Sequence, residues 1–387
     1  MNKIICLLVL ITFQPAFSQE ATNKKDSKYS FTVLKNLEAT EVQNQNSTST
    51  CWSFSSLSFF ESELMRMGKS KTVNLSEMFV VRKTYDLKAR NYIRMHGKTN
   101  FAEGGGFPDV LNVMRTYGIV PEDVYTGKKE PKTPHNHQLL EGTLKNILST
   151  AAKDETQKID FNFMVNSVNA VCDEYLGKVP DTFSSEGKTF TPVSYANSLG
   201  INPDDYVIIT SFTHHPFYKK FVLEIPDNWN WESVYNVPLN ELQSLMKEAL
   251  EKGFSIAWGA DVSEKGFLFK EGLALVPEKP IQDMGEEEKQ NLSLMPQPQL
   301  TITQELRQKA FDNFETQDDH GMHITGMARD QNGTLYYIVK NSWGKERNQC
   351  GGYFYASESY VLYKTTSIML HKKALSPALA VKLGIAQ

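Results

Sequence analysis

Hydrophobic positions divide the chain into a helical part followed by a strand-rich part. Apolar residues recur every three or four positions over residues 51–67, 76–85 and 108–117. This spacing is typical of amphipathic helices. Ser76 suits a helix N-cap and Pro108 a first helical turn. The first third of the chain is therefore expected to be mostly helical.

The sequence pattern changes near residue 205, where short apolar runs rich in β-branched and aromatic residues begin. Asn332-Gly333 is a strong turn signal and predicts a hairpin between residues 321–328 and 335–341. The last strands are expected near Tyr353 and Tyr360. The other predicted elements here are strands at 207–209, 221–223 and 254–262, and a helix at about 240–252.

Helices first and strands afterwards predict an α+β fold rather than alternating α/β units. A cleft between two such halves is a natural place for a site. The expected parts are a helical lobe at about 40–125, a partly helical insertion at about 127–200, a strand-rich lobe at about 205–365 and a C-terminal arm at 371–387.

The first 18 residues have the pattern of a cleaved export signal. Lys3 precedes an apolar run at residues 4–13, and Ala16-Phe17-Ser18 supplies small residues for cleavage. Removal would leave 387 − 18 = 369 residues with no later run of 18 apolar residues. We therefore expect an exported protein, periplasmic or secreted, that is soluble and has no membrane partner after processing.

Charge and histidine spacing exclude several classes of partner. The net charge of −4 and the pI near 6.1 give no electrostatic basis for binding nucleic acid. The histidine pairs at 135/137 and 214/215 have no acidic or cysteine partners at ligand spacing. We therefore expect no metal and no cofactor.

The processed chain would keep three cysteines, Cys51, Cys172 and Cys350. Exported proteins often pair their cysteines, and three cannot all pair. A Cys172–Cys350 disulfide stays open on the sequence alone. At least one thiol stays free, and its presence requires an explanation.

Cys51 stands where a polar stretch becomes an apolar helix. The free N–H groups and the dipole at a helix N-terminus favour thiolate over thiol. Beside a protonated imidazole such a cysteine is a nucleophile at neutral pH. The alternative is a small buried hydrophobe, and the polar residues 46–50 argue against it.

A cysteine nucleophile needs a histidine and a group that orients it. His320 and His323 are three apart in a predicted strand, so only one can face Cys51. Asn341 follows the return strand, and its carbonyl can accept the imidazole N–H while Trp343 shields that bond. Gln45 and the Cys51 backbone N–H are candidate hydrogen-bond donors to the oxyanion. Considered without the other residues, Gln45 would be interpreted as an ordinary loop residue.

Together these residues resemble the papain family of cysteine peptidases. The resemblance rests on Gln45 six positions before Cys51-Trp52, on His320-Gly321-Met322, and on the segment Asn341-Ser342-Trp343-Gly344. The family pattern has a small and then an apolar residue after the histidine, which favours His320 over His323 as the catalytic residue. The resemblance implies the two-lobed papain fold, with a central catalytic helix and an antiparallel, β-barrel-like lobe.

Within this family the chain is similar to bleomycin hydrolase and its related bacterial aminopeptidases. Further stretches carry that similarity, among them residues 104–108, 117–121 and 256–262. It implies a substrate site at Gly105, Gly106 and Trp343, with the two glycines along the peptide backbone. Two features depart from that branch, because this chain is shorter and carries an export signal.

The function expected from these features is an exported cysteine peptidase acting on peptides, as an aminopeptidase. In the bleomycin hydrolase branch a C-terminal arm lies in the cleft and restricts the enzyme to free amino ends. Residues 371–387 are either such an arm or an ordinary helix packed on a lobe. An endopeptidase or transferase of the same fold, a non-catalytic peptide-binding protein, and a homo-oligomeric ring stay open as alternatives.

Overall fold

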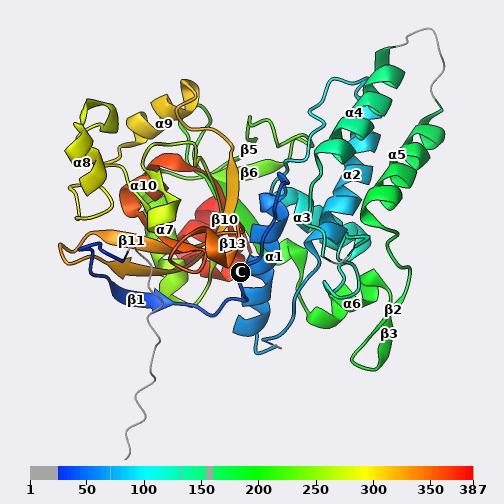
Figure 1. Cartoon of the computed structure of the whole chain (residues 1–387), viewed down its shortest axis with the longest axis horizontal. Helices are drawn as coiled ribbons and strands as arrows, with labels where there is room; N and C mark the ends of the chain where they lie inside the picture. The colour runs from blue at the N-terminus through cyan, green and yellow to red at the C-terminus, as the bar shows by residue number, and fades with distance from the viewer. Residues whose placement is uncertain (1–24, 70, 131, 154–159, 387) are drawn as a thin grey trace, which may run out of the picture.

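The protein has two lobes on either side of one central helix. The computed structural model describes residues 25–69, 71–130, 132–153 and 160–386. The central helix, α1 (Cys51–Arg66), separates a group of helices from a large sheet (Figure 1). The predicted α+β class is confirmed. The predicted signal peptide at 1–18 lies outside the described residues.

The helical lobe forms where the apolar spacing predicts helices. Helix α1 begins at Cys51, and Ser76 caps α2 through a hydrogen bond from the Phe79 N–H. The described part of the predicted insertion contains three helices and a small hairpin. The elements of this lobe after α1 are α2 (Glu77–Arg94), α3 (Phe107–Tyr117), α4 (Gln138–Lys153), α5 (Phe161–Leu176), β2 (Phe183–Ser185), β3 (Lys188–Phe190) and α6 (Pro192–Leu199).

The second lobe is built on one sheet, which within the described residues has 11 strands. Most neighbours pair antiparallel, but β4 with β6 and β12 with β9 pair parallel. Its strands are β1 (Thr32–Asn36), β4 (Tyr206–Thr210), β5 (Lys220–Val222), β6 (Ser233–Asn236), β7 (Ile256–Ala260), β8 (Phe267–Leu268), β9 (Leu273–Ala274), β10 (His320–Arg329), β11 (Leu335–Lys340), β12 (Tyr353–Ser357) and β13 (Thr365–His371).

The predicted hairpin is formed by β10 and β11. Gly333 has φ +86°, a left-handed conformation that glycine adopts without steric cost. Asp330 stabilises the turn because its Oδ1 accepts the backbone N–H groups of Asn332 and Thr334. On its other side β10 pairs with β7, and it also packs along α1. This arrangement brings the start of β10 to the start of the central helix.

The strand predicted near Tyr360 is wrong, because that residue lies in α10 (Glu358–Lys364). Ser357 caps this helix by accepting the N–H of Tyr360. Tyr360 and Val361, which indicated a strand, are buried in this helix, and the strand β13 follows it. The remaining helices of this lobe are α7 (Leu239–Glu251), α8 (Glu286–Asn291), α9 (Gln304–Asp312) and α11 (Pro377–Leu383).

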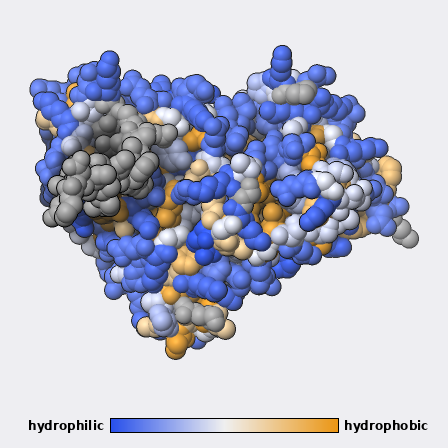
Figure 2. Space-filling model, turned by 90° about the horizontal axis from the view of Figure 1, so that it is seen from below, coloured by the Kyte–Doolittle hydropathy of each residue, from blue (hydrophilic) through white to orange (hydrophobic). Residues whose placement is uncertain are grey.

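One face is mostly hydrophilic, with hydrophobic residues showing in patches along its middle (Figure 2). Among the residues that the structure describes, no helix is both long and apolar enough to cross a membrane.

Candidate active site

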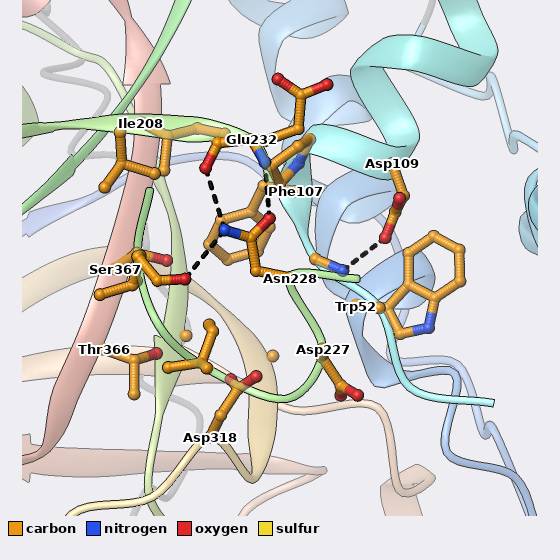
Figure 3. A pocket seen from close by; sticks show the side chains of 18 of the residues that line it. Trp52, Phe107, Asp109, Ile208, Asp227, Asn228, Glu232, Asp318, Thr366 and Ser367 are labelled. Atoms are coloured by element: carbon orange, nitrogen blue, oxygen red, sulfur yellow. Dashed lines mark hydrogen bonds between the residues drawn. The ribbon is translucent and has the colours of Figure 1, made fainter. Parts of the chain in front are cut away.

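A cavity lies between the two lobes and is lined by residues of both. Cys51 and Trp52 come from α1, and Gly105 and Gly106 come from the segment that leads into α3. His320 comes from β10 on the opposite side. Figure 3 shows this cavity, with Trp52 on one side and Thr366 and Ser367 of β13 on the other. The fold therefore brings together residues more than 250 positions apart in the sequence.

Cys51 is the first residue of α1 and is 8% exposed. Burial raises the pKa of its thiol to about 12, and the negative charges of Asp227 and Asp318 raise it further. The backbone N–H groups of Gly321 and Trp52 act in the opposite direction. The sequence predicts a lowered pKa, but burial and two carboxylates outweigh the helix N-terminus. The thiol form is therefore favoured here.

His320 is buried and hydrogen-bonded to Asn341, with 2.7 Å between Nε2 and Oδ1. Asn341 Oδ1 also accepts the backbone N–H of Ser342 at 2.8 Å, which identifies this atom as the oxygen. Nε2 must then carry the proton in that bond, so Nδ1 is the nitrogen free to accept another. Burial lowers the pKa of His320 to about 4, although the bond to Asn341 raises it.

Trp343 covers the imidazole of His320. The two ring centroids are 4.8 Å apart, with 37° between the planes. Phe267 and Phe269 pack edge-on against the indole and hold it in place. This position agrees with the predicted shielding of the His320–Asn341 bond. Trp343 does not line the cavity itself, so its predicted contact with substrate stays a prediction.

His323 lies away from the cavity. Its Nδ1 is 2.9 Å from Oγ of Ser58, two turns along α1 from Cys51, and its ring packs edge-on against Phe59. Burial lowers its pKa well below the ordinary value, with a smaller contribution from the positive charge of Lys340. Of the two candidate histidines, only His320 shares the cavity with Cys51.

Gln45 is buried beside the asparagine segment. Its Oε1 accepts the Ser342 hydroxyl and its Nε2 donates to the Thr48 carbonyl, both at 2.7 Å. The backbone N–H of Gln45 also donates to the Ser342 carbonyl. One N–H of the side-chain amide is left over for another acceptor. Gln45 is not part of the cavity wall, and its role toward an oxyanion stays a prediction.

Gly105 and Gly321 are positions where a side chain would not fit. A Cβ on Gly105 would come within 2.7 Å of Asp109 Oδ2 and 2.9 Å of the Trp52 ring. A Cβ on Gly321 would come within 2.7 Å of Ser55 Oγ and 3.1 Å of the Trp52 Cα. Gly321 therefore lets β10 lie directly against the first turn of α1. In the sequence, Gly321 is recognised only as part of the His320-Gly321-Met322 motif, and its packing role is not predicted.

Residues 223–232 form a wall of the cavity that the sequence analysis does not anticipate. This crossing loop joins β5 to β6 and reaches the helical lobe, where Trp229 Nε1 donates to Asp109. The only sequence signal is a polar, tryptophan-containing stretch between two short strands. Asp318 also lines the cavity, two positions before His320, and was likewise not singled out.

The histidine pair at 214/215 does have an acidic partner, which corrects the sequence analysis. Glu224 accepts from Nε2 of His214 at 3.1 Å and of His215 at 2.8 Å. The three residues could hold a metal ion by distance. However, Gln308 Nε2 donates to Nδ1 of His214, which leaves Nε2 of a neutral ring protonated and unable to ligate. The donor set therefore does not fit a metal without rearrangement.

The Cys172–Cys350 disulfide, which the sequence left undecided, is not formed. Cys51, Cys172 and Cys350 are all free and buried. Cys172 lies in α5 of the helical lobe, whereas Cys350 precedes β12 in the other lobe.

The C-terminal arm packs as a helix on the strand-rich lobe. Leu379 and Leu383 of α11 join the core of that lobe, and Lys382 pairs with Glu241 of α7. Residues 371–386 do not line the cavity that contains Cys51. Residues 384–386 line a neighbouring pocket that shares Pro108, Ile208 and Glu232 with it. The described part of the arm thus lies beside the cleft rather than within it.

A cleft with a cysteine on a central helix and an asparagine-bound histidine on the facing sheet is the architecture of papain-like cysteine peptidases. The model of the Peptidase C1-like family matches residues 80–384, and the chain belongs to this family. His320 and Asn341 lie inside the matched range, and Cys51 and Gln45 precede it.

Curated relatives match most of the chain at low identity. Aminopeptidase G of Lactobacillus delbrueckii subsp. lactis is 22% identical over 379 residues, covering 87% of this chain and 82% of that protein. Aminopeptidase C of Streptococcus thermophilus is 22% identical, with 92% and 85% covered. The crystal structure of PepW from Lactobacillus rhamnosis HN001 superposes with a TM-score of 0.72 at 20% identity, covering 91% of this chain and 84% of that one.

Proposed function

We propose that this protein is an exported cysteine peptidase that removes residues from the free amino end of peptides. One observation carries the catalytic part of the proposal. Cys51 lines the same cavity as His320, whose orientation is fixed by the 2.7 Å bond from Nε2 to Asn341. That bond leaves Nδ1 of His320 as the free base of the site.

In the proposed reaction the Cys51 thiol gives its proton to Nδ1 of His320 and the sulfur attacks the scissile carbonyl carbon. The carbonyl oxygen becomes an oxyanion held by the Cys51 backbone N–H and the free N–H of Gln45. The C–N bond then breaks, and His320 returns the proton to the leaving amine. Water gives a proton to His320 and attacks the thioester, which releases the acid and restores Cys51.

Two features support action at amino ends. The relatives in the Lactobacillus and Streptococcus species are named aminopeptidases. In this chain the crossing loop, residues 223–232, limits one side of the cleft. Asn91 and Asn100 of the helical lobe bind its backbone carbonyls at Trp229 and Pro226. A long peptide would meet this loop, whereas a chain that begins near Cys51 would not.

The test is hydrolysis of two fluorogenic peptides under reducing conditions, one with a free amino end and one N-blocked. The proposal predicts cleavage of the free-amino substrate alone, abolished by Cys51→Ala. Cys350→Ala removes a thiol outside the cavity and should leave cleavage intact. Cleavage of the blocked substrate at a similar rate would indicate an endopeptidase. No cleavage across a range of peptides would favour the non-catalytic binding protein.

Export is proposed from residues 1–18 alone. Fractionation of cells that produce the full chain should recover a shortened protein outside the cytoplasm. Deleting the apolar run at 4–13 should retain it in the cytoplasm; export of the deleted form would contradict this part of the proposal.

A further inference from the structure

The cavity wall is acidic. The described residues that line it supply five carboxylates, from Asp109, Asp227, Glu232, Asp318 and Asp319, and no lysine or arginine. Three of these carboxylates are occupied by hydrogen bonds. Asp109 accepts from Gly106 and Trp229, Glu232 accepts from Asn112, and Asp319 accepts from Val262 and Ser263.

Asp227 and Asp318 keep vacant acceptor positions. The Asp318 carboxyl accepts the backbone N–H of Asp227, but its buried Oδ2 has no hydrogen-bond partner among the described residues. Within the same residues, the side chain of Asp227 accepts from Asn100 Nδ2 alone, at 3.4 Å. The two residues lie next to each other at the cavity, one from the crossing loop and one from the segment before β10 (Figure 3). A buried polar atom of this kind costs free energy unless something binds it.

The two adjacent carboxylates must either share a proton or bind a cation. Burial raises the pKa of Asp318 to about 8, and the neighbouring charges of Asp227 and Asp319 raise it further. Burial also raises the pKa of Asp227, the positive charge of Lys88 lowers it, and the negative charge of Glu141 raises it. Lys88 cannot fill the gap, because its ammonium donates to the carbonyls of Ala102 and Gly104 behind the cavity wall.

We propose that Asp227 and Asp318 bind the protonated α-amino group of the peptide whose carbonyl lies at Cys51. This inference rests on the proposed function and names the residues that would restrict it to free amino ends. An ammonium offers three donors and a full positive charge, which match two carboxylates with vacant acceptor positions. An N-acetylated end offers one neutral donor and a bulkier group, and would leave both carboxylates unpaired.

The same pair links amine binding to the nucleophile. The negative charges of Asp227 and Asp318 both raise the pKa of the Cys51 thiol. A bound ammonium compensates these charges, so proton transfer from Cys51 to His320 becomes easier when a substrate with a free amino end occupies the site. The subsite therefore affects both the binding of a substrate with a free amino end and the reactivity of the Cys51 thiol.

The C-terminal arm is the competing site for binding the amine. Residues 384–386 line the pocket beside the cavity, and the two spaces share Glu232. A chain lacking residues 384–387 tests this alternative without altering Asp227 or Asp318.

The experiment measures binding in Cys51→Ala protein, so that it does not depend on turnover. Calorimetry compares a dipeptide amide that has a free amino end with its N-acetyl counterpart. We expect the free form to bind more tightly, and Asp227→Asn or Asp318→Asn to reduce that difference by about 10- to 100-fold. Asp283→Asn, an exposed aspartate in the strand-rich lobe, is the matched control and should retain the difference.

Two results would overturn the inference. One is equal binding of the two ligands, and the other is an unchanged preference in the Asp227→Asn, Asp318→Asn double variant that melts like the parent. Loss of the preference only on deletion of 384–387 would assign the amine to the chain end. If the preference depends on the aspartates but protein with intact Cys51 cleaves no peptide, the subsite stands and the proposed peptidase activity fails.

Discussion

Asn341 holds His320 through its carbonyl oxygen, with 2.7 Å between Oδ1 and Nε2. The same oxygen accepts the backbone N–H of Ser342, and the Trp343 ring lies over the imidazole. These contacts fix both the tautomer and the orientation of the ring. The imidazole is thus prepared to exchange a proton at Nδ1, on the side that is not occupied by Asn341.

Replacing Asn341 with alanine should lower kcat by about 10- to 100-fold, because the imidazolium formed during catalysis loses a charge-assisted hydrogen bond. KM should change much less, since Asn341 does not line the cavity. Steady-state kinetics with a free-amino peptide tests this. An Asn341→Ala enzyme with unchanged kcat and a raised KM would argue against an orienting role.

The two histidines should respond differently to substitution. His320→Ala removes the base and should reduce kcat by about 100- to 10,000-fold. His323→Gln should keep most of the activity but lower the melting temperature, because His323 is buried and bonded to Ser58. The pair of measurements is kcat and thermal unfolding for both variants. Greater loss of activity in His323→Gln than in His320→Ala would reverse the assignment.

Gly321→Ala should reduce activity through a displacement of β10. Its Cβ would meet Ser55 Oγ at 2.7 Å and the backbone of Trp52 at 3.1 Å, so the strand must move away from α1 and take His320 with it. Gly142→Ala is the control, because no atom lies within 4 Å of that Cβ in α4. It should stabilise the protein by about 0.5–1 kcal/mol without affecting kcat. Equal kcat for the two variants and the wild type would contradict this packing role.

The pH dependence of Cys51 alkylation should shift when Asp318 becomes asparagine. The carboxylates of Asp227 and Asp318 raise the thiol pKa, so removing one negative charge lowers it. The alkylation rate with neutral iodoacetamide should then begin to rise at lower pH than in the wild type. Peptide mapping separates Cys51 from the other two thiols. A profile displaced to higher pH would show that the carboxylates do not act on Cys51 in this way.

Local patterns in the sequence predicted the helix and the hairpin that position the candidate site. The apolar spacing after Cys51 indicated α1, and Asn332-Gly333 indicated the β10–β11 turn. The position of His320 three residues before His323 in a strand correctly implied that only one shares a cavity with the cysteine. Each of these features depends on interactions between near neighbours in the chain, which periodicity and turn chemistry describe.

Features that depend on distant segments were missed. The docking of residues 223–232 onto the helical lobe follows from contacts such as Trp229 with Asp109, 120 positions apart. The raised pKa of Cys51 was predicted with the wrong sign, because its burial and the charge of Asp318 arise only in the folded protein. Likewise, Glu224 meets the histidine pair through the path of the chain between β4 and β6 rather than through ligand spacing.

The most direct test of the central claim is to label the protein with an aminoacyl vinyl sulfone and identify the modified cysteine by mass spectrometry. A probe with a free amino group and its N-acetyl counterpart are compared under reducing conditions. The account predicts one adduct, on Cys51, that forms faster with the free-amino probe and is absent in His320→Ala. Labelling of Cys172 or Cys350 instead, or equal labelling by both probes, would contradict it.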